Sequence, residues 1–61
     1  MQKLIELREK RAAKITEMRG LHAKDALEGN EETRFKALET EVQTIDGQIA
    51  REERMAEYQE S

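Results

Sequence analysis

The sequence contains no cysteine, proline or tryptophan, and only one tyrosine, one phenylalanine and one valine. Without cysteine the chain has no disulfide framework and no thiolate metal site, which fits a cytoplasmic protein. Its longest apolar runs are pairs such as Leu4-Ile5, so it predicts no membrane span and no signal-peptide core. The shortage of valine and aromatic residues argues against a β-sheet.

Charged residues are abundant, at 41% of the chain against 36% hydrophobic residues. Glu, Lys, Arg, Ala and Leu dominate, which is typical of long helices and coiled coils. The net charge of −3 argues against a nucleic-acid partner for the chain as a whole. Residues 1–24 carry a net +4 and residues 25–61 a net −7, so the two halves attract one another within one chain or between chains.

A chain of 61 residues forms one small unit, and we treat residues 1–61 as a single helical segment. The few large apolar side chains make a small core, and chains of this size often need oligomerisation to be stable. We therefore expect the segment either to associate with itself or to be an excised part of a larger protein.

The first half predicts a helix from about residue 2 to about residue 27. Its large apolar residues recur at steps typical of one helical face: Leu4, Leu7, Ile15, Met18 and Leu21. Gly20 lies inside this stretch and costs about 1 kcal/mol relative to alanine, so a bend is expected near it.

Gly29-Asn30 is the predicted break between two helices. Glycine commonly follows a helix C-terminus because it adopts positive φ, and asparagine caps the N-terminus of the next helix. The second helix is expected from about residue 31 to about residue 59. Its apolar residues alternate in steps of three and four, as heptad positions a and d of a coiled coil: Phe35, Leu38, Val42, Ile45 and Ile49.

The fold class predicted from these patterns is all-α, with two long helices that form a helical hairpin or a coiled-coil assembly. A tight turn would pack the helices antiparallel and place facing residues at numbers that sum to about 57. Arg8 and Arg11 interrupt the apolar face of the first helix. Two interpretations stay open: their stems lie on apolar surface with the heads in water, or they pair with Asp46 and Glu53 across the interface and fix its register.

No catalytic, cofactor-binding or metal site is predicted. Two helices offer no formed pocket for general acid–base chemistry, and the single serine is Ser61. His22 is the only histidine, and with Asp25 it supplies too few ligands for a metal. We interpret His22 as a residue at the edge of a helix interface.

Basic residues concentrate in the first half, which raises the alternative of binding to phosphates or to an anionic membrane. That half contains no aromatic residue and has three interleaved glutamates, while the second half supplies an acidic partner. These features favour a solvated or ion-paired face, with no membrane and no nucleic acid as partner.

Two blocks of the sequence resemble a known family. Residues 1–12 read MQKLIELREKRA and residues 31–42 read EETRFKALETEV, continued by Ile45-Asp46, Ile49 and Glu53-Arg54. They resemble the N-terminal region of prophage-encoded major capsid proteins of the Hong Kong 97 type. The sequence departs from the family in its shorter connection between the blocks, in Gly29-Asn30 before the glutamate pair, and in lacking the shell domain.

The resemblance implies a scaffold function. In that family the N-terminal helical segment, the delta domain, guides capsid subunits into the procapsid and is then removed by a prohead protease. Its partners would be itself, as a homo-oligomer, and other capsid subunits, in the cytoplasm of a bacterial host. The alternatives from other classes are a coiled-coil adaptor for a partner protein, and a nucleic-acid-binding helical arm like those of some aminoacyl-tRNA synthetases.

Overall fold

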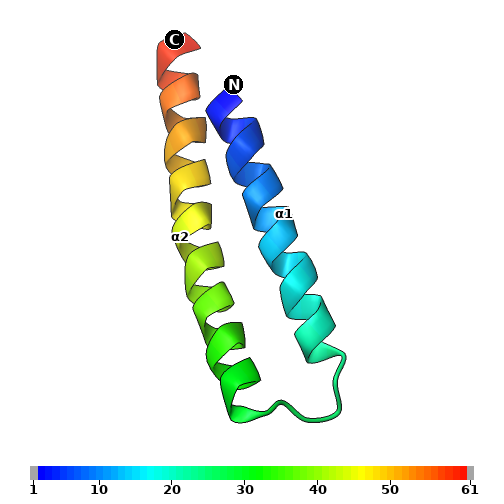
Figure 1. Ribbon diagram of the computed structural model, residues 1–61. Helices are drawn as coiled ribbons and strands as arrows, with labels where there is room; N and C mark the ends of the chain where they lie inside the picture. Colours follow the sequence, from blue (N-terminus) through cyan, green and yellow to red (C-terminus); the bar gives the residue numbers. More distant parts are fainter. Residues whose placement is uncertain (1, 61) are drawn as a thin grey trace.

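The computed structural model describes residues 2–60 and forms a helical hairpin. Helix α1 (Gln2–His22) and helix α2 (Gly29–Glu60) are joined by a loop of residues 23–28. The helices lie side by side and antiparallel, so both chain ends are at one end of a rod that measures 50 × 14 × 13 Å (Figure 1). The two-helix hairpin confirms the all-α prediction, and residues 2–60 contain no strand.

The predicted position of the break is wrong. Helix α1 ends at His22 rather than near residue 27, and the break is residues 23–28 rather than Gly29-Asn30. At the end of α1, the Ala23 amide donates to the Arg19 carbonyl at 3.0 Å, but the Lys24 amide donates to the Leu21 carbonyl at 3.1 Å. The change from four-residue to three-residue spacing tightens the last turn and ends the helix.

Gly29 and Asn30 are the first two residues of α2, not a cap on α1. No glycine among the described residues has positive φ, so Gly29 does not form the left-handed C-cap that the sequence predicted. The N-cap is Glu28, whose carbonyl accepts from the Glu32 amide at 2.9 Å. The Glu28 amide in turn donates to Glu31 Oε1 at 3.1 Å, which is the reciprocal half of a capping box.

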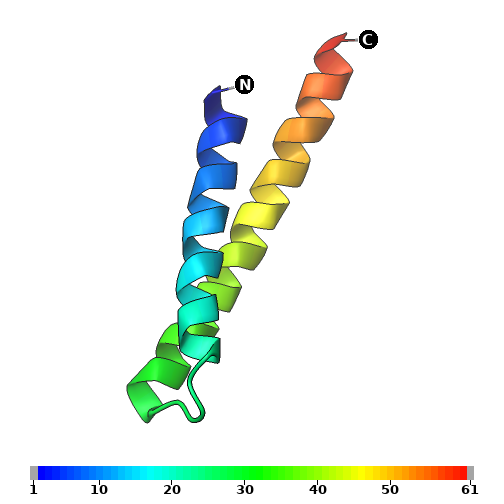
Figure 2. The ribbon, with the colours of Figure 1, turned by 90° about the vertical axis from the view of Figure 1, so that its right-hand side faces the viewer.

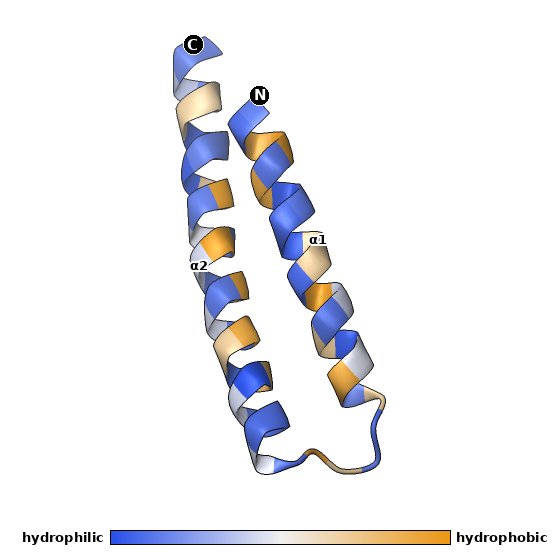
Figure 3. Ribbon diagram, viewed as in Figure 1, coloured by the Kyte–Doolittle hydropathy of each residue, from blue (hydrophilic) through white to orange (hydrophobic). Residues whose placement is uncertain are grey.

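The core is a narrow strip between the helices. Among residues 2–60 three side chains are buried, Leu7 from α1 and Leu38 and Ile45 from α2, and of these Leu38 alone is fully enclosed. In Figure 3 the hydrophobic stretches of α2 lie along the side that faces α1. Figure 2 shows that the helix axes cross obliquely and diverge toward the chain ends. Two helices therefore enclose only part of the apolar surface that the sequence supplies.

Candidate functional site

The ten apolar residues predicted for the helix interface are all at least half-buried, but they are buried unequally. On α2 the d positions, Leu38 and Ile45, are 0% and 6% exposed. The a positions, Phe35, Val42 and Ile49, are only half-buried. On α1 only Leu7 is buried, and the other predicted residues are half-buried: Leu4, Ile15, Met18 and Leu21. Helix α1 thus covers the d row of α2 and leaves its a row partly open to solvent.

The open a row belongs to one of two grooves that flank the helix interface. This groove, which we name the Phe35 flank, is lined near the loop by Ile15, Met18, Arg19, His22 and Phe35. At 3.6 residues per turn, Val42 and Ile49 continue the same side of α2 toward the chain ends. The apolar lining makes this groove suited to another helix or apolar side chains.

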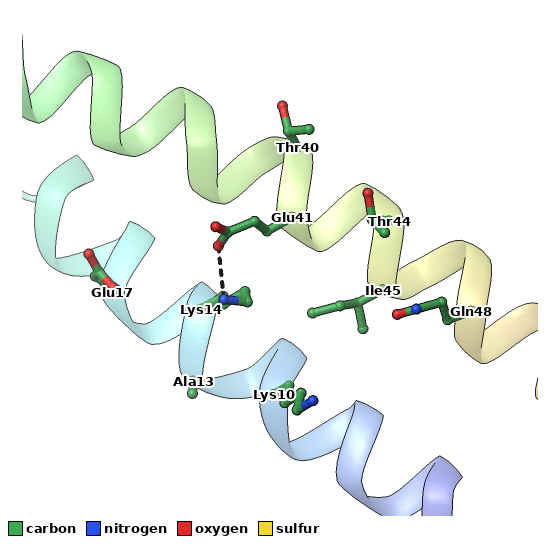
Figure 4. Close-up of a pocket in the computed structure, with 9 residues that line it drawn as sticks. All are labelled: Lys10, Ala13, Lys14, Glu17, Thr40, Glu41, Thr44, Ile45 and Gln48. Carbon is green, nitrogen blue, oxygen red and sulfur yellow. Dashed lines mark ion pairs between the residues drawn. The ribbon is translucent and has the colours of Figure 1, made fainter.

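The groove on the opposite side has polar and charged side chains beside apolar surface. We name it the Lys14 flank, and Figure 4 shows the side chains that line it. Helix α1 contributes Lys10, Ala13, Lys14 and Glu17, and helix α2 contributes Thr40, Glu41, Thr44, Ile45 and Gln48. Lys14 Nζ lies 2.8 Å from Glu41 Oε2 across the groove. Since hydroxyl, amide and ion-paired groups line it, this flank is suited to contact with water.

The four residues predicted to form interface ion pairs lie in two pairs between the helices. Arg8 Nη2 lies 2.8 Å from Glu53 Oε2, and Arg11 Nε lies 2.5 Å from Asp46 Oδ1. The Arg11–Asp46 pair falls at the register sum of 57 that the sequence predicted. Both arginines donate from their guanidinium groups to a carboxylate of the other helix, as the pairing interpretation expects.

Sequence reasoning did not single out several further ion pairs. Between the helices they are Lys3–Glu52 at 3.2 Å, Lys14–Glu41 at 2.8 Å and Glu17–Arg34 at 2.6 Å. Lys24 also pairs with Glu31 across the loop. The signal for most of them was available: Lys3–Glu52, Lys14–Glu41 and Lys24–Glu31 lie within two of the predicted register sum. Applying that register to every charged residue would have found them.

These pairs shift the pKa values of their members. The Arg34 guanidinium, which donates two hydrogen bonds to Glu17, holds the pKa of that carboxyl below its usual range, and Glu17 raises the pKa of Arg34. The Lys14 ammonium lowers the pKa of Glu41. Lys24, and after it the Glu28 amide, lower the pKa of Glu31. Each glutamate therefore contributes most to the hairpin in its ionised form.

The ion pairs also bear on the binding of phosphates. Helix α1 carries six lysine and arginine residues, and four of them pair with a carboxylate: Lys3, Arg8, Arg11 and Lys14. Such pairs would have to break before the cations could neutralise a nucleic-acid backbone. Helix α1 therefore presents little unpaired positive charge, although its basic residues had suggested a nucleic-acid-binding arm.

Between residues 2 and 60 the structure groups no three histidine, cysteine, aspartate or glutamate side chains in a way that could hold a metal ion. His22 lines the Phe35 flank, at the edge of the interface. Neither described helix has the length and apolar character needed to cross a membrane.

Comparison with known proteins adds no family to this description. No protein-family model, no curated protein and no solved structure matches the chain. The functional conclusion therefore rests on the hairpin, its two unlike flanks and the sequence blocks described above.

Proposed function

We propose that the chain is a non-enzymatic helical segment whose function is self-association, and that it scaffolds the assembly of capsid subunits. The observation that carries the first part is the partly open a row, where Phe35, Val42 and Ile49 are only half-buried although they continue the pattern of the buried d row. Burying such surface is the main favourable contribution to helix association in water.

The small core of the single hairpin supports the same proposal. Only three side chains are buried among residues 2–60. A core of this size contributes little stability on its own, and two-helix units generally gain theirs from further packing. The association that completes the core would also be reversible, because each copy contributes only part of the apolar contact.

The capsid part of the proposal is carried by the sequence blocks at residues 1–12 and 31–42, which resemble the delta domain of Hong Kong 97-type capsid proteins. The hairpin is compatible with that role, since a scaffold must hold subunits together weakly enough to be released. Removal by a prohead protease would end the association once the shell has formed.

Self-association is tested by sedimentation equilibrium on the purified chain and on two lysine variants. Val42→Lys places a charge on the Phe35 flank, and Thr44→Lys places the same charge on the Lys14 flank. We expect an oligomer for the native chain and for Thr44→Lys, and a monomer for Val42→Lys. A native chain that stays monomeric at about 1 mM, roughly a thousandfold above a micromolar Kd, would contradict self-association and favour the adaptor hypothesis.

The capsid role is tested in the gene that encodes the chain. If the reading frame continues past Ser61 into a shell domain, we expect deletion of residues 2–60 to abolish procapsid formation. The shell domain alone should remain folded in that experiment. Normal procapsids from the deletion, or a frame that ends at Ser61, would contradict a fused scaffold and leave self-association to be judged on its own.

A further inference from the structure

The Phe35 flank has one basic edge and one acidic edge. Helix α1 contributes Arg8, Arg11, Arg19 and His22, and helix α2 contributes Glu39, Asp46 and Glu53. At 3.6 residues per turn, each set lies within about 100° of arc on its helix, together with the apolar residues of the groove. A second molecule that covers the groove therefore meets ion pairs nearer the chain ends and, nearer the loop, Arg19 on α1 and Glu39 on α2.

Two charges on these edges have no ion-pair partner within residues 2–60. Arg8–Glu53 and Arg11–Asp46 occupy the part of the flank nearer the chain ends. Arg19 and Glu39 lie nearer the loop, and both are exposed. They are on the outer edges of different helices, at heights that differ by about one residue, roughly 1.5 Å, in the register set by Arg11–Asp46. Each therefore has room for a partner from outside the hairpin.

The geometry points to a second copy of this chain on the Phe35 flank, with the two loops at the same end of the dimer. This inference rests on the self-association proposed above and specifies its surface and its orientation. Two flat hairpins can stack face to face about a two-fold axis in two ways. With the loops at the same end, α1 of each copy packs on α2 of the other. With the loops at opposite ends, α1 packs on α1 and α2 packs on α2.

Charge selects between the two arrangements. The same-end dimer places the basic edge of each copy on the acidic edge of the other, and Arg19 faces Glu39 of the second copy twice by symmetry. The opposite-end dimer places like charges together along both edges, which disfavours it. Both arrangements make every neighbouring pair of helices antiparallel, as in a four-helix bundle with short loops, so charge alone distinguishes them.

Orientation is measured with one spin label per chain. The sequence has no cysteine, so Ala26→Cys in the loop introduces a single labelling site. We expect a label-to-label distance of roughly 10–30 Å by double electron–electron resonance, because packed helices lie about 10 Å apart. A distance near the 50 Å length of the hairpin would show the opposite-end dimer and overturn the inference.

The ion pair is tested by charge reversal and rescue. Arg19→Glu and Glu39→Arg are each expected to weaken dimerisation roughly tenfold, since the symmetric dimer contains the contact twice. The double variant should recover most of the native affinity. Arg19 lies in the last turn of α1, where a cation interacts favourably with the helix dipole, so Arg19→Glu could also act by destabilising the helix. Recovery of affinity in the double variant would show that the effect comes from pairing with Glu39.

The matched control is Lys10→Glu, which makes the same kind of reversal on the Lys14 flank. We expect it to leave the dimer constant within about twofold, as for exposed charges without a partner. Equal weakening by Arg19→Glu and Lys10→Glu, or no rescue in the double variant, would overturn the inference. A dimer of the wrong orientation contradicts only this inference, whereas a monomeric native chain contradicts the proposed self-association itself.

Discussion

Replacing Leu38 with alanine should remove most of the stability of the hairpin. Its side chain is 0% exposed and is the one fully enclosed side chain among residues 2–60. Truncating a buried leucine to alanine costs about 2–5 kcal/mol, and the lower part of this range applies where neighbours can collapse into the space, as between two helices. Single cores in chains of this size rarely supply more than about 3–5 kcal/mol. A loss of about 2–3 kcal/mol is therefore a large fraction of the total.

The assay is urea denaturation followed by circular dichroism at several protein concentrations, because association adds to apparent stability. The control is Met55→Ala, another truncation to alanine on α2, at a side chain that is 46% exposed. We expect the control to change the free energy of unfolding by less than about 0.5 kcal/mol. Similar losses for the two variants would refute the packing argument, because they would show that Leu38 is not enclosed as the structure describes.

Three further predictions concern the helices and their charges. Gly47→Ala should raise the thermal midpoint by stabilising α2 by about 0.5–1 kcal/mol, since an added Cβ at Gly47 meets nothing within 4 Å; a lower midpoint would contradict this. Stability measured by urea titration should fall as the pH drops below about 4.5, the ordinary pKa of glutamate, because Glu17 and Glu41 have lowered pKa values and the folded state binds fewer protons than the unfolded state. The fall should be smaller in 1 M salt, which screens the pairs, and a flat profile at low salt would count against them. Glu31→Ala should increase amide exchange in residues 28–32 more than Glu31→Gln, because glutamine can still accept from the Glu28 amide; equal exchange would mean that the capping bond is unimportant.

The helical hairpin was predictable because helix periodicity and antiparallel register depend on local spacing. Apolar residues at steps of three and four define one face of each helix. The charge difference between the two halves then favours antiparallel pairing, and Arg11 lies opposite Asp46 as the register indicates. These inferences need only the geometry of the helix, so they hold without knowledge of the loop.

The loop was less predictable because its boundaries depend on hydrogen bonds that compete closely in energy. Gly29-Asn30 has the residue types of a helix end. In the structure, the side chain of Glu31 instead accepts from the Glu28 amide with one oxygen and pairs with Lys24 with the other. One carboxylate thus caps α2 and ties it to the segment that leaves α1. A capping box that begins with Glu28 has no serine or threonine at its N-cap, so it lacks the usual sequence signature.

The unequal burial of the a and d rows could not be read from the sequence pattern. A heptad repeat indicates that the apolar residues of both rows favour burial, but it does not indicate how many neighbouring helices bury them. The antiparallel neighbour α1 covers Leu38 and Ile45 and leaves Phe35, Val42 and Ile49 half-buried. The row that α1 leaves open is also the one flanked by the unpaired Arg19 and Glu39. The same flank thus carries half-buried apolar side chains and unpaired charges. A second helical layer on this flank would bury the apolar side chains and pair the charges.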